Sequence, residues 1–445
     1  MSRWVQGAYA PVEQEVDCVD LEVDGVIPPE LNGMLARIGP NPIGEVGEDH
    51  QLFLGDGMIH SLTLEGGRAV SYRNRWVRTE PVAGKLGEEP KDAPIDHLDC
   101  ANTHIFPFAG SLYALTETSI PYAVSSDLDT EGRADFDGFI DTGFTAHPHV
   151  DPRTGQMHAI GYDVSPDKAA THFVFAADGS PLRKNVLELG GSSWIHDFAA
   201  SEHFMIVWDL PLQYNTEMAA AGAQIPFRWT PGYEARVGLR RLDAEDASVL
   251  WFDGPQAFVF HPVNAWEETD ASGKIIKVVC DTCRYPKMYD QVRTGPGDMA
   301  PPQLYRWTFD LTTGQMTEEQ IDPRAQEFAR IDDRFWGQKH NFAVTTELFR
   351  FTGETGIIAH YDDAEPQAWS MGKGVVTSEA VFVPESDTAA QGEGYVLAAA
   401  TDAQSGASRV SIFDSQKVAK GPLAEVLLPV KMPVTFHGSW LPAVK

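Results

Sequence analysis

Short apolar runs, many of them alternating with polar residues and each followed by a turn motif, recur along the whole 445-residue chain. Examples are MIHSLTLE at 58–65, HFMIVWDL at 203–210 and GYVLAAATD at 394–402. Alternation with a period of two is typical of β-strands that bury one face, and long amphipathic helical stretches are scarce. The pattern therefore predicts an all-β protein.

The turns between these runs carry the residues that β-hairpins need. Gly66-Gly67 and Asp178-Gly179 can supply positive φ angles, and the motif D-x-x-T-G at 151–155 and 310–314 can supply a turn with a bulge. The 30 prolines and 39 glycines interrupt the sequence throughout. We therefore expect hairpins along the whole chain.

The number of strands points to a β-propeller. Strands at this spacing over about 400 residues are too many for one sandwich, whereas radial repetition of four-stranded sheets leaves only short, protected edges. Six to eight blades of about 50–60 residues would use the whole chain. Because no long linker separates parts of the sequence, residues 1–445 are predicted to form a single β-propeller domain.

The charge excludes several classes of partner. A formal net charge of −30 leaves no basic stripe for nucleic acid and disfavours adsorption to an anionic membrane.

The N-terminal residues MSRWVQGAYAPV form no apolar signal segment, and no run of 18 apolar residues occurs, so we expect a cytoplasmic protein without stable membrane insertion. The sequence leaves the oligomeric state open.

Four cysteines are too few for a disulfide framework. Cys280 and Cys283 form a single C-x-x-C motif, whereas a zinc site would need a second pair. The surrounding KIIKVVCDTCRY is typical of a strand. We therefore expect buried free thiols.

Four histidines each lie inside a distinctive local motif. They are His147 in FTAHPHVDPRTG, His196 in SSWIHDFAASEHF, His261 in VFHPVNAWEE and His437 in PVTFHGSWLP. Their separations of 49, 65 and 176 residues place them on different blades, whose inner strands meet at the axis of a propeller. Four imidazoles that converge there would hold a first-row transition metal.

Three glutamates lie among apolar residues, where a carboxylate is costly unless it is paired. They are Glu117 in SLYALTETSIPY, Glu327 in QEFARIDDRF and Glu379 in TSEAVFVP. A metal-binding histidine usually donates its other ring N–H to a carboxylate or carbonyl. We therefore expect these glutamates to orient metal-bound histidines.

Fe(II) is the favoured ion, because dioxygen chemistry at an open coordination site needs a redox metal. Spacing alone leaves zinc and manganese open, and His60 and His104 are reserve candidates for ligands. Two other functions also stay open. One is a propeller hydrolase or lactonase with a divalent ion such as Ca²⁺ held by oxygen ligands, and the other is a non-catalytic binding propeller.

Ten collinear blocks, from about residue 20 to the C-terminus, resemble the carotenoid cleavage oxygenase family. They are PPELNGMLARIGPNP (28–42), FLGDGMIH (53–60), ANTHIF with GSLYALTE (101–117), TAHPHVDPRTG (145–155), HDFAASEHF (196–204), FHPVNAWEE (260–268), EFARID (327–332), EAVFVP (379–384), EGYVLAAATD (393–402) and KGPLAEVLLPVKMPVTFHGSW (420–440).

The resemblance implies a seven-bladed β-propeller whose active-site face is capped by loops and short helices. It implies Fe(II) bound by His147, His196, His261 and His437, with Glu117, Glu327 and Glu379 paired to three of them and His147 lacking a glutamate. The implied reaction is cleavage of a C=C double bond by O2 to two carbonyl products, without an organic cofactor. Isomerisation, known among retinoid-acting relatives, is the alternative outcome.

The implied substrate is a small hydrophobic olefin, either an apocarotenoid or another conjugated or aromatic alkene. Aromatic residues that neighbour the ligand segments are candidates for the substrate wall, with ordinary core packing as the alternative for each. They are Phe53, Phe106, Trp194, Phe260 and Phe436.

Two departures from the family pattern bear on the substrate. Relatives that cleave hydroxylated stilbenes carry a lysine after the D-F-D-G turn, whereas here the turn at 135–138 is followed by Phe139. In the charged stretch 79–99 the tyrosine-bearing loop of those relatives is shortened, and the stretch is polar where relatives that extract substrate from membranes have an apolar patch. Both differences favour a short, soluble, non-phenolic substrate.

Overall fold

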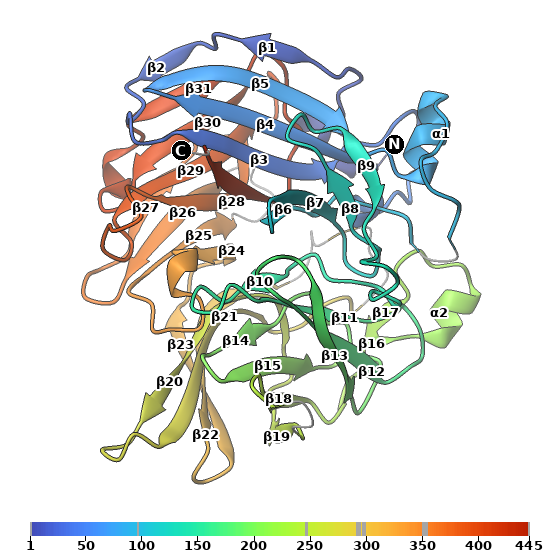
Figure 1. The fold of residues 1–445 in the computed structure, drawn as a ribbon, viewed down its shortest axis with the longest axis vertical. Coiled ribbons are helices and arrows are strands. Elements are labelled where there is room, and N and C mark those ends of the chain that lie inside the picture. Colours follow the sequence, from blue (N-terminus) through green and yellow to red (C-terminus); the bar gives the residue numbers. More distant parts are fainter. Residues whose placement is uncertain are drawn as a thin grey trace. The chain divides into compact units, whose positions relative to one another are not determined.

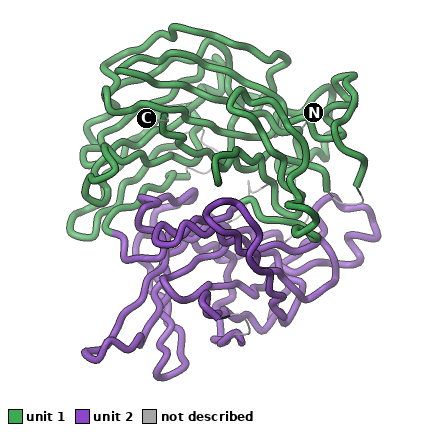
Figure 2. The backbone as a smooth tube through the Cα atoms, in the orientation of Figure 1, with its two compact units in different colours: residues 1–146, 341–445 green, residues 147–340 purple. Residues whose placement is uncertain are grey.

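The computed structural model describes residues 2–95, 98–244, 248–290, 295, 300–348 and 355–443. The chain divides into two compact units (Figure 2). Unit 1 contains residues 1–146 and 341–445, and unit 2 contains residues 147–340. The single domain expected over 1–445 stays a prediction.

Unit 1 consists mainly of antiparallel sheets (Figure 1). One sheet has the order β1 (Asp17–Val19), β5 (Arg68–Trp76), β4 (Gly57–Glu65), β3 (Gly33–Pro40) and β32 (His437–Pro442). Another has the order β2 (Val23–Gly25), β31 (Ala424–Leu427), β30 (Ser408–Asp414), β29 (Gly394–Asp402) and β28 (Val375–Pro384). A third sheet contains β6 (His104–Phe108), β7 (Ser111–Leu115), β8 (Tyr122–Val124) and β9 (Thr130–Arg133). The remaining strands, β25 (Phe342–Leu348), β26 (Thr355–Tyr361) and β27 (Gln367–Ser370), lie side by side in the order of the sequence.

Unit 2 repeats the same hairpin pattern. Its first sheet contains β10 (His149–Val150), β11 (Met157–Gly161), β12 (Ala169–Phe175) and β13 (Pro181–Glu188). The next has the order β14 (Ala199–Ala200), β15 (Phe204–Asp209), β18 (Arg236–Arg241) and β19 (Leu250–Asp253), and β16 (Leu212–Tyr214) pairs with β17 (Phe227–Trp229). The last contains β20 (Phe258–Thr269), β21 (Ile275–Tyr285), β22 (Gln303–Asp310) and β23 (Gln315–Asp322), and β24 (Gln326–Ile331) follows.

The strand order gives seven sheets of four or five strands when β24 is counted as the first strand of the β25–β27 sheet, together with the two-stranded β16–β17 ribbon. Most sheets are made of strands that follow one another along the chain, as expected for propeller blades. Seven is also the number of blades that the family resemblance predicts.

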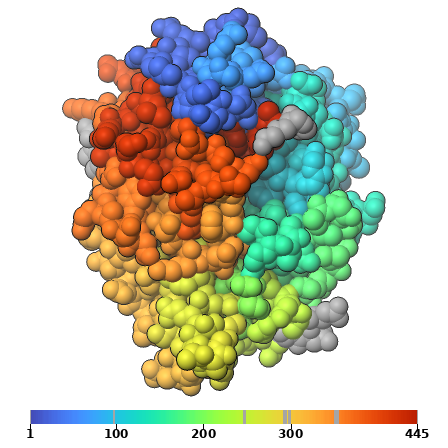
Figure 3. Space-filling model, turned by 60° about the vertical axis from the view of Figure 1, so that its left-hand side comes forward, coloured from blue at the N-terminus to red at the C-terminus, as the bar shows by residue number. Residues whose placement is uncertain are grey.

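The N-terminal and C-terminal segments share both five-stranded sheets of unit 1. β32 pairs with β3, so that His437 lies opposite Ile38, and β31 pairs with β2. Figure 3 shows the blue N-terminal residues beside the red C-terminal ones. Because β3 is buried along most of its length, this pairing fixes the start of β32 inside unit 1.

The turns predicted from the sequence are present. Gly66 and Gly67, with φ angles of 55° and 76°, connect β4 to β5. Gly155 and Gly314 both have a φ angle of 70°, at the ends of the two D-x-x-T-G motifs. A residue with a Cβ atom is strained in this left-handed region, which explains glycine at these positions.

Two short α-helices, α1 (Glu80–Leu86) and α2 (Thr216–Ala220), occur in the described part of the chain. In α1, Thr79 Oγ1 accepts a hydrogen bond from Val82 N at the start, and Gly87 ends the helix with a φ angle of 74°. The charged stretch 79–99 thus contains a helix with a buried face, which the sequence did not predict. No helix in the described ranges is long and apolar enough to cross a bilayer.

The C-x-x-C motif lies in β21, as expected. Cys280 and Cys283 are both buried and neither forms a disulfide. Burial raises the pKa of each thiol well above its usual value. Such thiols stay protonated, which agrees with a packing role and not with metal binding or redox chemistry.

The core of unit 1 forms where its two five-stranded sheets pack. Leu35 and Leu62 from one sheet belong to the same buried cluster as Val381, Leu397 and Ile412 from the other. Each fully buried aliphatic side chain stabilises the fold by about 1.5–3 kcal/mol relative to an exposed one. The cluster includes Val381 of β28, the strand that carries Glu379, and Trp440 of β32, the strand that carries His437, packs against it.

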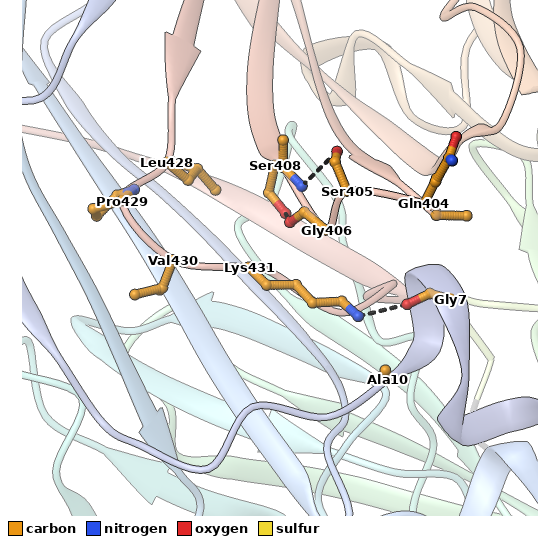
Figure 4. A pocket seen from close by; sticks show the side chains of 12 residues that line it. Gly7, Ala10, Gln404, Ser405, Gly406, Ser408, Leu428, Pro429, Val430 and Lys431 are labelled. Atoms are coloured by element: carbon orange, nitrogen blue, oxygen red, sulfur yellow. Dashed lines mark hydrogen bonds between the residues drawn. The ribbon is translucent and has the colours of Figure 1, made fainter.

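A surface hollow of about 560 Å³ lies in unit 1 (Figure 4). It is lined by Gly7, Ala10 and the segments 403–408 and 428–431. Lys431 Nζ donates a hydrogen bond to the carbonyl of Gly7 in this hollow. None of the predicted site residues lines it, so it is distinct from the candidate site.

We predict that unit 1 loses stability as the pH falls below 6.5, because His60 is neutral in the folded protein. His60 is 3% exposed, and burial lowers its pKa from 6.5 to about 3. Between these values the unfolded chain binds the proton and the folded chain does not, so acid favours unfolding. At pH 5 this costs on the order of 2 kcal/mol relative to pH 7.

Urea unfolding at pH 7 and pH 5 measures this cost. His60→Gln keeps a polar group beside the Tyr72 hydroxyl, which lies 2.7 Å from His60 Nδ1, but removes the titration. The variant should lose less stability than the original chain on going to pH 5. An identical loss would show that His60 does not contribute.

Candidate metal centre

Three of the four predicted ligand histidines lie together in unit 2. Nε2 of His147 is 3.0 Å from Nε2 of His196. The ring centroids of His147 and His196 both lie within 5.0 Å of the His261 ring, at 4.9 and 5.0 Å respectively. One ring nitrogen of each histidine lies within 4.8 Å of the corresponding nitrogens of the other two. The structure therefore brings these imidazoles to one point.

Irregular backbone directs these three side chains. His147 is followed by Pro148 and precedes β10, and His196 lies in an irregular segment that ends at β14. His261 lies within β20, where the register with β21 shifts on both sides of Pro262. Proline cannot donate a hydrogen bond to the sheet, so the strand bulges there and turns its neighbours out of the regular alternation.

Glu327 orients His261 within unit 2. Its Oε2 atom accepts a hydrogen bond from His261 Nδ1 at 2.5 Å, and the glutamate is only 2% exposed. The next residue, Phe328, has a φ angle of 54° and donates its backbone N–H to the same carboxylate. The Phe328 ring also stacks on His261 at 5.5 Å. His261 Nδ1 is thereby engaged, and Nε2 is the nitrogen that can bind a metal.

Glu379 and His437 form the same arrangement in unit 1. Oε1 of Glu379 lies 3.0 Å from Nδ1 of His437, and Oε2 accepts a hydrogen bond from Gly438 N at 2.9 Å. Both side chains are buried, with exposed fractions of 3% and 2%. Glu379 lies where the β28–β29 register shifts between Thr377 and Ala380. Here the bulge directs a carboxylate toward an imidazole.

Arg37, which the sequence did not single out, holds both members of this pair in place. It lies in β3 and is 2% exposed. Its hydrogen bonds include those to Thr435 Oγ1 (2.8 Å), Glu379 O (2.7 Å), Ser378 Oγ (2.9 Å) and Phe436 O (3.1 Å). These acceptors immediately flank His437 and Glu379, so the guanidinium fixes the backbone on both sides. Only the fold reveals this, because Arg37 is remote from both in the sequence.

Glu117 lies just after β7 in unit 1 and is partly buried. Thr118, which follows it, has a φ angle of 63°, so the chain turns sharply at this carboxylate. Glu117 thus shares with Glu327 a following residue in the left-handed region. Its role beside a metal-binding histidine stays a prediction.

The predicted wall residues of unit 2 contact the histidine group. Phe260 lies edge-on to His196, with ring centroids 5.1 Å apart, and stacks beside His261 at 6.1 Å. Trp194 lies edge-on to Phe260 at 6.1 Å and stacks on Tyr289 at 5.6 Å. Both predicted residues are less than 9% exposed, so they form an apolar surface beside the imidazoles.

The predicted wall residues of unit 1 pack differently. Phe53 and Phe436 are in contact at 5.8 Å, and Phe436 directly precedes His437. Phe106 lies in β6 and contacts His104 edge-on at 5.5 Å. Core packing accounts for these contacts, and their role toward a substrate stays a prediction.

The two reserve histidines have other partners. His104 Nδ1 bonds to the carbonyl of Ala146 at 3.0 Å, and its Nε2 lies 3.3 Å from Ser439 Oγ. His60 Nδ1 bonds to the Tyr72 hydroxyl at 2.7 Å. Each is a buried histidine with a hydrogen-bonding role in the core.

The donor atoms of unit 2 fit a transition metal. Two nitrogens that bind one metal ion at about 2.1 Å and at right angles lie about 3.0 Å apart. This equals the 3.0 Å between Nε2 of His147 and Nε2 of His196. Imidazole nitrogen suits iron, copper, zinc and nickel, whereas Ca²⁺ requires oxygen ligands. The residues present therefore fit the expected iron and disfavour a calcium-dependent hydrolase.

Comparisons with known proteins agree with this chemistry. A family model described as retinal pigment epithelial membrane protein matches residues 9–442. A carotenoid cleavage oxygenase of Mycobacterium tuberculosis is 32% identical, over 99% of this chain and 97% of its own length. An isoeugenol monooxygenase of Pseudomonas nitroreducens is 28% identical, over 98% of this chain and 97% of its own.

A solved structure shares the fold. The lignostilbene dioxygenase of Pseudomonas brassicacearum has a TM-score of 0.88 and 26% identity, and the match covers 100% of this chain and 99% of that one. The β-propeller predicted from the sequence, with the seven blades that the family resemblance implies, is thereby confirmed. All three relatives are named as oxygenases, which confirms the predicted enzyme class. The chain belongs to the family of retinal pigment epithelial membrane protein and the carotenoid cleavage oxygenases.

Proposed function

We propose that this protein is an Fe(II)-dependent dioxygenase that cleaves the C=C bond of a small conjugated or aromatic olefin, such as an apocarotenoid. O2 is the second substrate, and the products are two carbonyl compounds. The observation that carries the proposal is the convergence of three imidazoles, with 3.0 Å between the Nε2 atoms of His147 and His196.

His437 is the proposed fourth ligand. Its Nδ1 atom is held by Glu379 as that of His261 is held by Glu327, with N–O distances of 3.0 and 2.5 Å. In both pairs the carboxylate fixes the ring and leaves Nε2 for a metal. Four neutral imidazoles would leave up to two coordination positions for substrates. Glu117 is the proposed carboxylate partner of one more metal-binding histidine.

The side chains position and shield the reactants, and iron, when bound, supplies the redox chemistry that activates O2. The proposed reaction breaks one C=C and one O–O bond and forms two C=O bonds, with no net gain or loss of protons. An acid or base is therefore not required. Phe260 and Trp194 supply an apolar surface that holds the olefin beside His196 and excludes water.

Phe139 argues against a phenolic substrate. It follows a turn in which Phe136, Asp137 and Gly138 all have positive φ angles, and it is partly buried. An aromatic ring at this position offers no cation for a phenolate, whereas a lysine would. We therefore favour a non-phenolic olefin over a hydroxylated stilbene. The names of two relatives refer to a carotenoid and to isoeugenol, and the olefins to be tested should range in size between these two kinds of substrate.

The test is incubation of the Fe(II)-loaded protein with apocarotenals, stilbenes and propenyl-phenols in air. We expect aldehydes that together account for all carbon atoms of a non-phenolic olefin, identified by mass. Cleavage of phenolic stilbenes in preference to all others would contradict the substrate assignment. Turnover of a lactone with Ca²⁺ and no cleavage of any olefin would contradict the function itself.

A further inference from the structure

Asp197 lies next to a proposed ligand and between two further histidines of unit 2. The carboxylate is 3% exposed. Its Oδ1 atom accepts hydrogen bonds from His149 Nε2 at 2.9 Å and from Phe198 N at 2.6 Å. Its Oδ2 atom lies 4.0 Å from Nδ1 of His147. One carboxylate therefore faces both a proposed ligand and a second, non-ligating histidine.

The position of this carboxylate is tightly fixed. The indole N–H of Trp208 donates to the backbone carbonyl of Asp197 at 2.6 Å. The His149 ring stacks on Trp336 with an interplanar angle of 12° and a centroid distance of 5.2 Å. It also contacts Phe198 edge-on at 5.1 Å. Because both His149 and the Asp197 backbone are held, Oδ2 stays directed toward His147.

We propose that Asp197, anchored by His149, is the carboxylate that compensates the charge of His147 when a metal is bound. This inference rests on the proposed metal site. Once Nε2 of His147 binds a divalent cation, the N–H at Nδ1 becomes more positive, and a buried carboxylate 4.0 Å away stabilises it. Asp197 thus supplies negative charge behind His147 as Glu327 does behind His261, but across 4.0 Å and not through a hydrogen bond at 2.5 Å.

A purely structural histidine–carboxylate pair is the alternative, and unit 2 contains one for comparison. Glu267 lies 2.8 Å from Nδ1 of His203 and accepts hydrogen bonds from His203 N and Ser201 Oγ. It matches Asp197 in being a nearly buried carboxylate bound to an imidazole and a backbone N–H. Neither Glu267 nor His203 belongs to the converging histidine group. Glu267→Gln is therefore the matched control.

The test is titration of the full-length apo-protein with Co(II), followed by its visible absorption. Asp197→Asn should raise the Kd for Co(II) about 10–100-fold and shift the absorption bands, because the charge behind His147 is lost. Glu267→Gln should leave both unchanged, and Asp197→Glu should restore part of the affinity. Thermal melting of the apo-proteins separates loss of the site from loss of the fold.

The outcomes decide between the proposals. An unchanged Kd and spectrum in Asp197→Asn, or an equal change in Glu267→Gln, would overturn the role of Asp197. If Asp197→Asn does not fold, His149→Phe decides: weaker Co(II) binding supports the anchor, and unchanged binding overturns it. His196→Ala in the same titration tests the metal site, since Co(II) affinity retained there would refute the proposed function instead.

Discussion

Substitution of His196 by alanine should remove bound iron and oxygenase activity together. Nε2 of His196 lies 3.0 Å from that of His147, so its loss takes away one nitrogen of a closely spaced donor pair. The remaining imidazoles would then have to hold the ion with one position filled by water. We expect iron content, measured by plasma mass spectrometry after gel filtration, to fall below a tenth of the original.

His203→Ala is the matched control for this experiment. His203 lies in the same unit, and its Nδ1 bonds to Glu267 at 2.8 Å, but it is not part of the histidine group. That variant should keep iron and activity. Normal iron content in His196→Ala would refute the role of His196 as a ligand.

Glu379→Gln should weaken metal retention or the rate about 10–100-fold while the fold persists. Glutamine keeps the shape, but its one carbonyl oxygen can accept from only one of His437 Nδ1 and Gly438 N, which lie 3.0 and 2.9 Å from the two carboxylate oxygens. What it lacks is the negative charge that makes the imidazole a better ligand. The experiment therefore tests the charge of Glu379 together with one of its two hydrogen bonds. Competition with a coloured chelator measures the change in iron affinity.

Glu425→Gln provides the comparison in the same sheet. Glu425 lies in β31 and bonds to Arg409 Nε at 2.7 Å and Ser411 Oγ at 2.9 Å, without a histidine. Its substitution should leave iron affinity unchanged. If Glu379→Gln behaves like this control, Glu379 does not support a metal ligand.

Local signals in the sequence predicted much of the fold. Apolar runs and glycine turns, such as Gly66-Gly67 between β4 and β5, are determined by neighbouring residues and can be found without a structure. The motifs around His147, His196 and His261 were equally visible. Their convergence followed from the propeller architecture and not from any local pattern.

Long-range pairings could not be predicted in this way. β32 pairs with β3, although the two strands are separated by almost the whole sequence. Arg37 depends on that pairing for its contacts with the backbone at Glu379 and Phe436. The sequence does not indicate a role for Asp197 either, because its contact with His149 forms only in the folded chain. The predicted cytoplasmic location and single domain stay predictions.

The ratio of O2 consumed to olefin cleaved tests the central claim most directly. The Fe(II)-loaded protein is mixed with the best olefin in a closed oxygen-electrode cell, and the aldehydes are counted by mass spectrometry. The account predicts one O2 consumed and two carbonyl products formed for each C=C bond cleaved. Product formation without O2 uptake, or no O2 uptake by iron-loaded protein with any conjugated olefin, would contradict it.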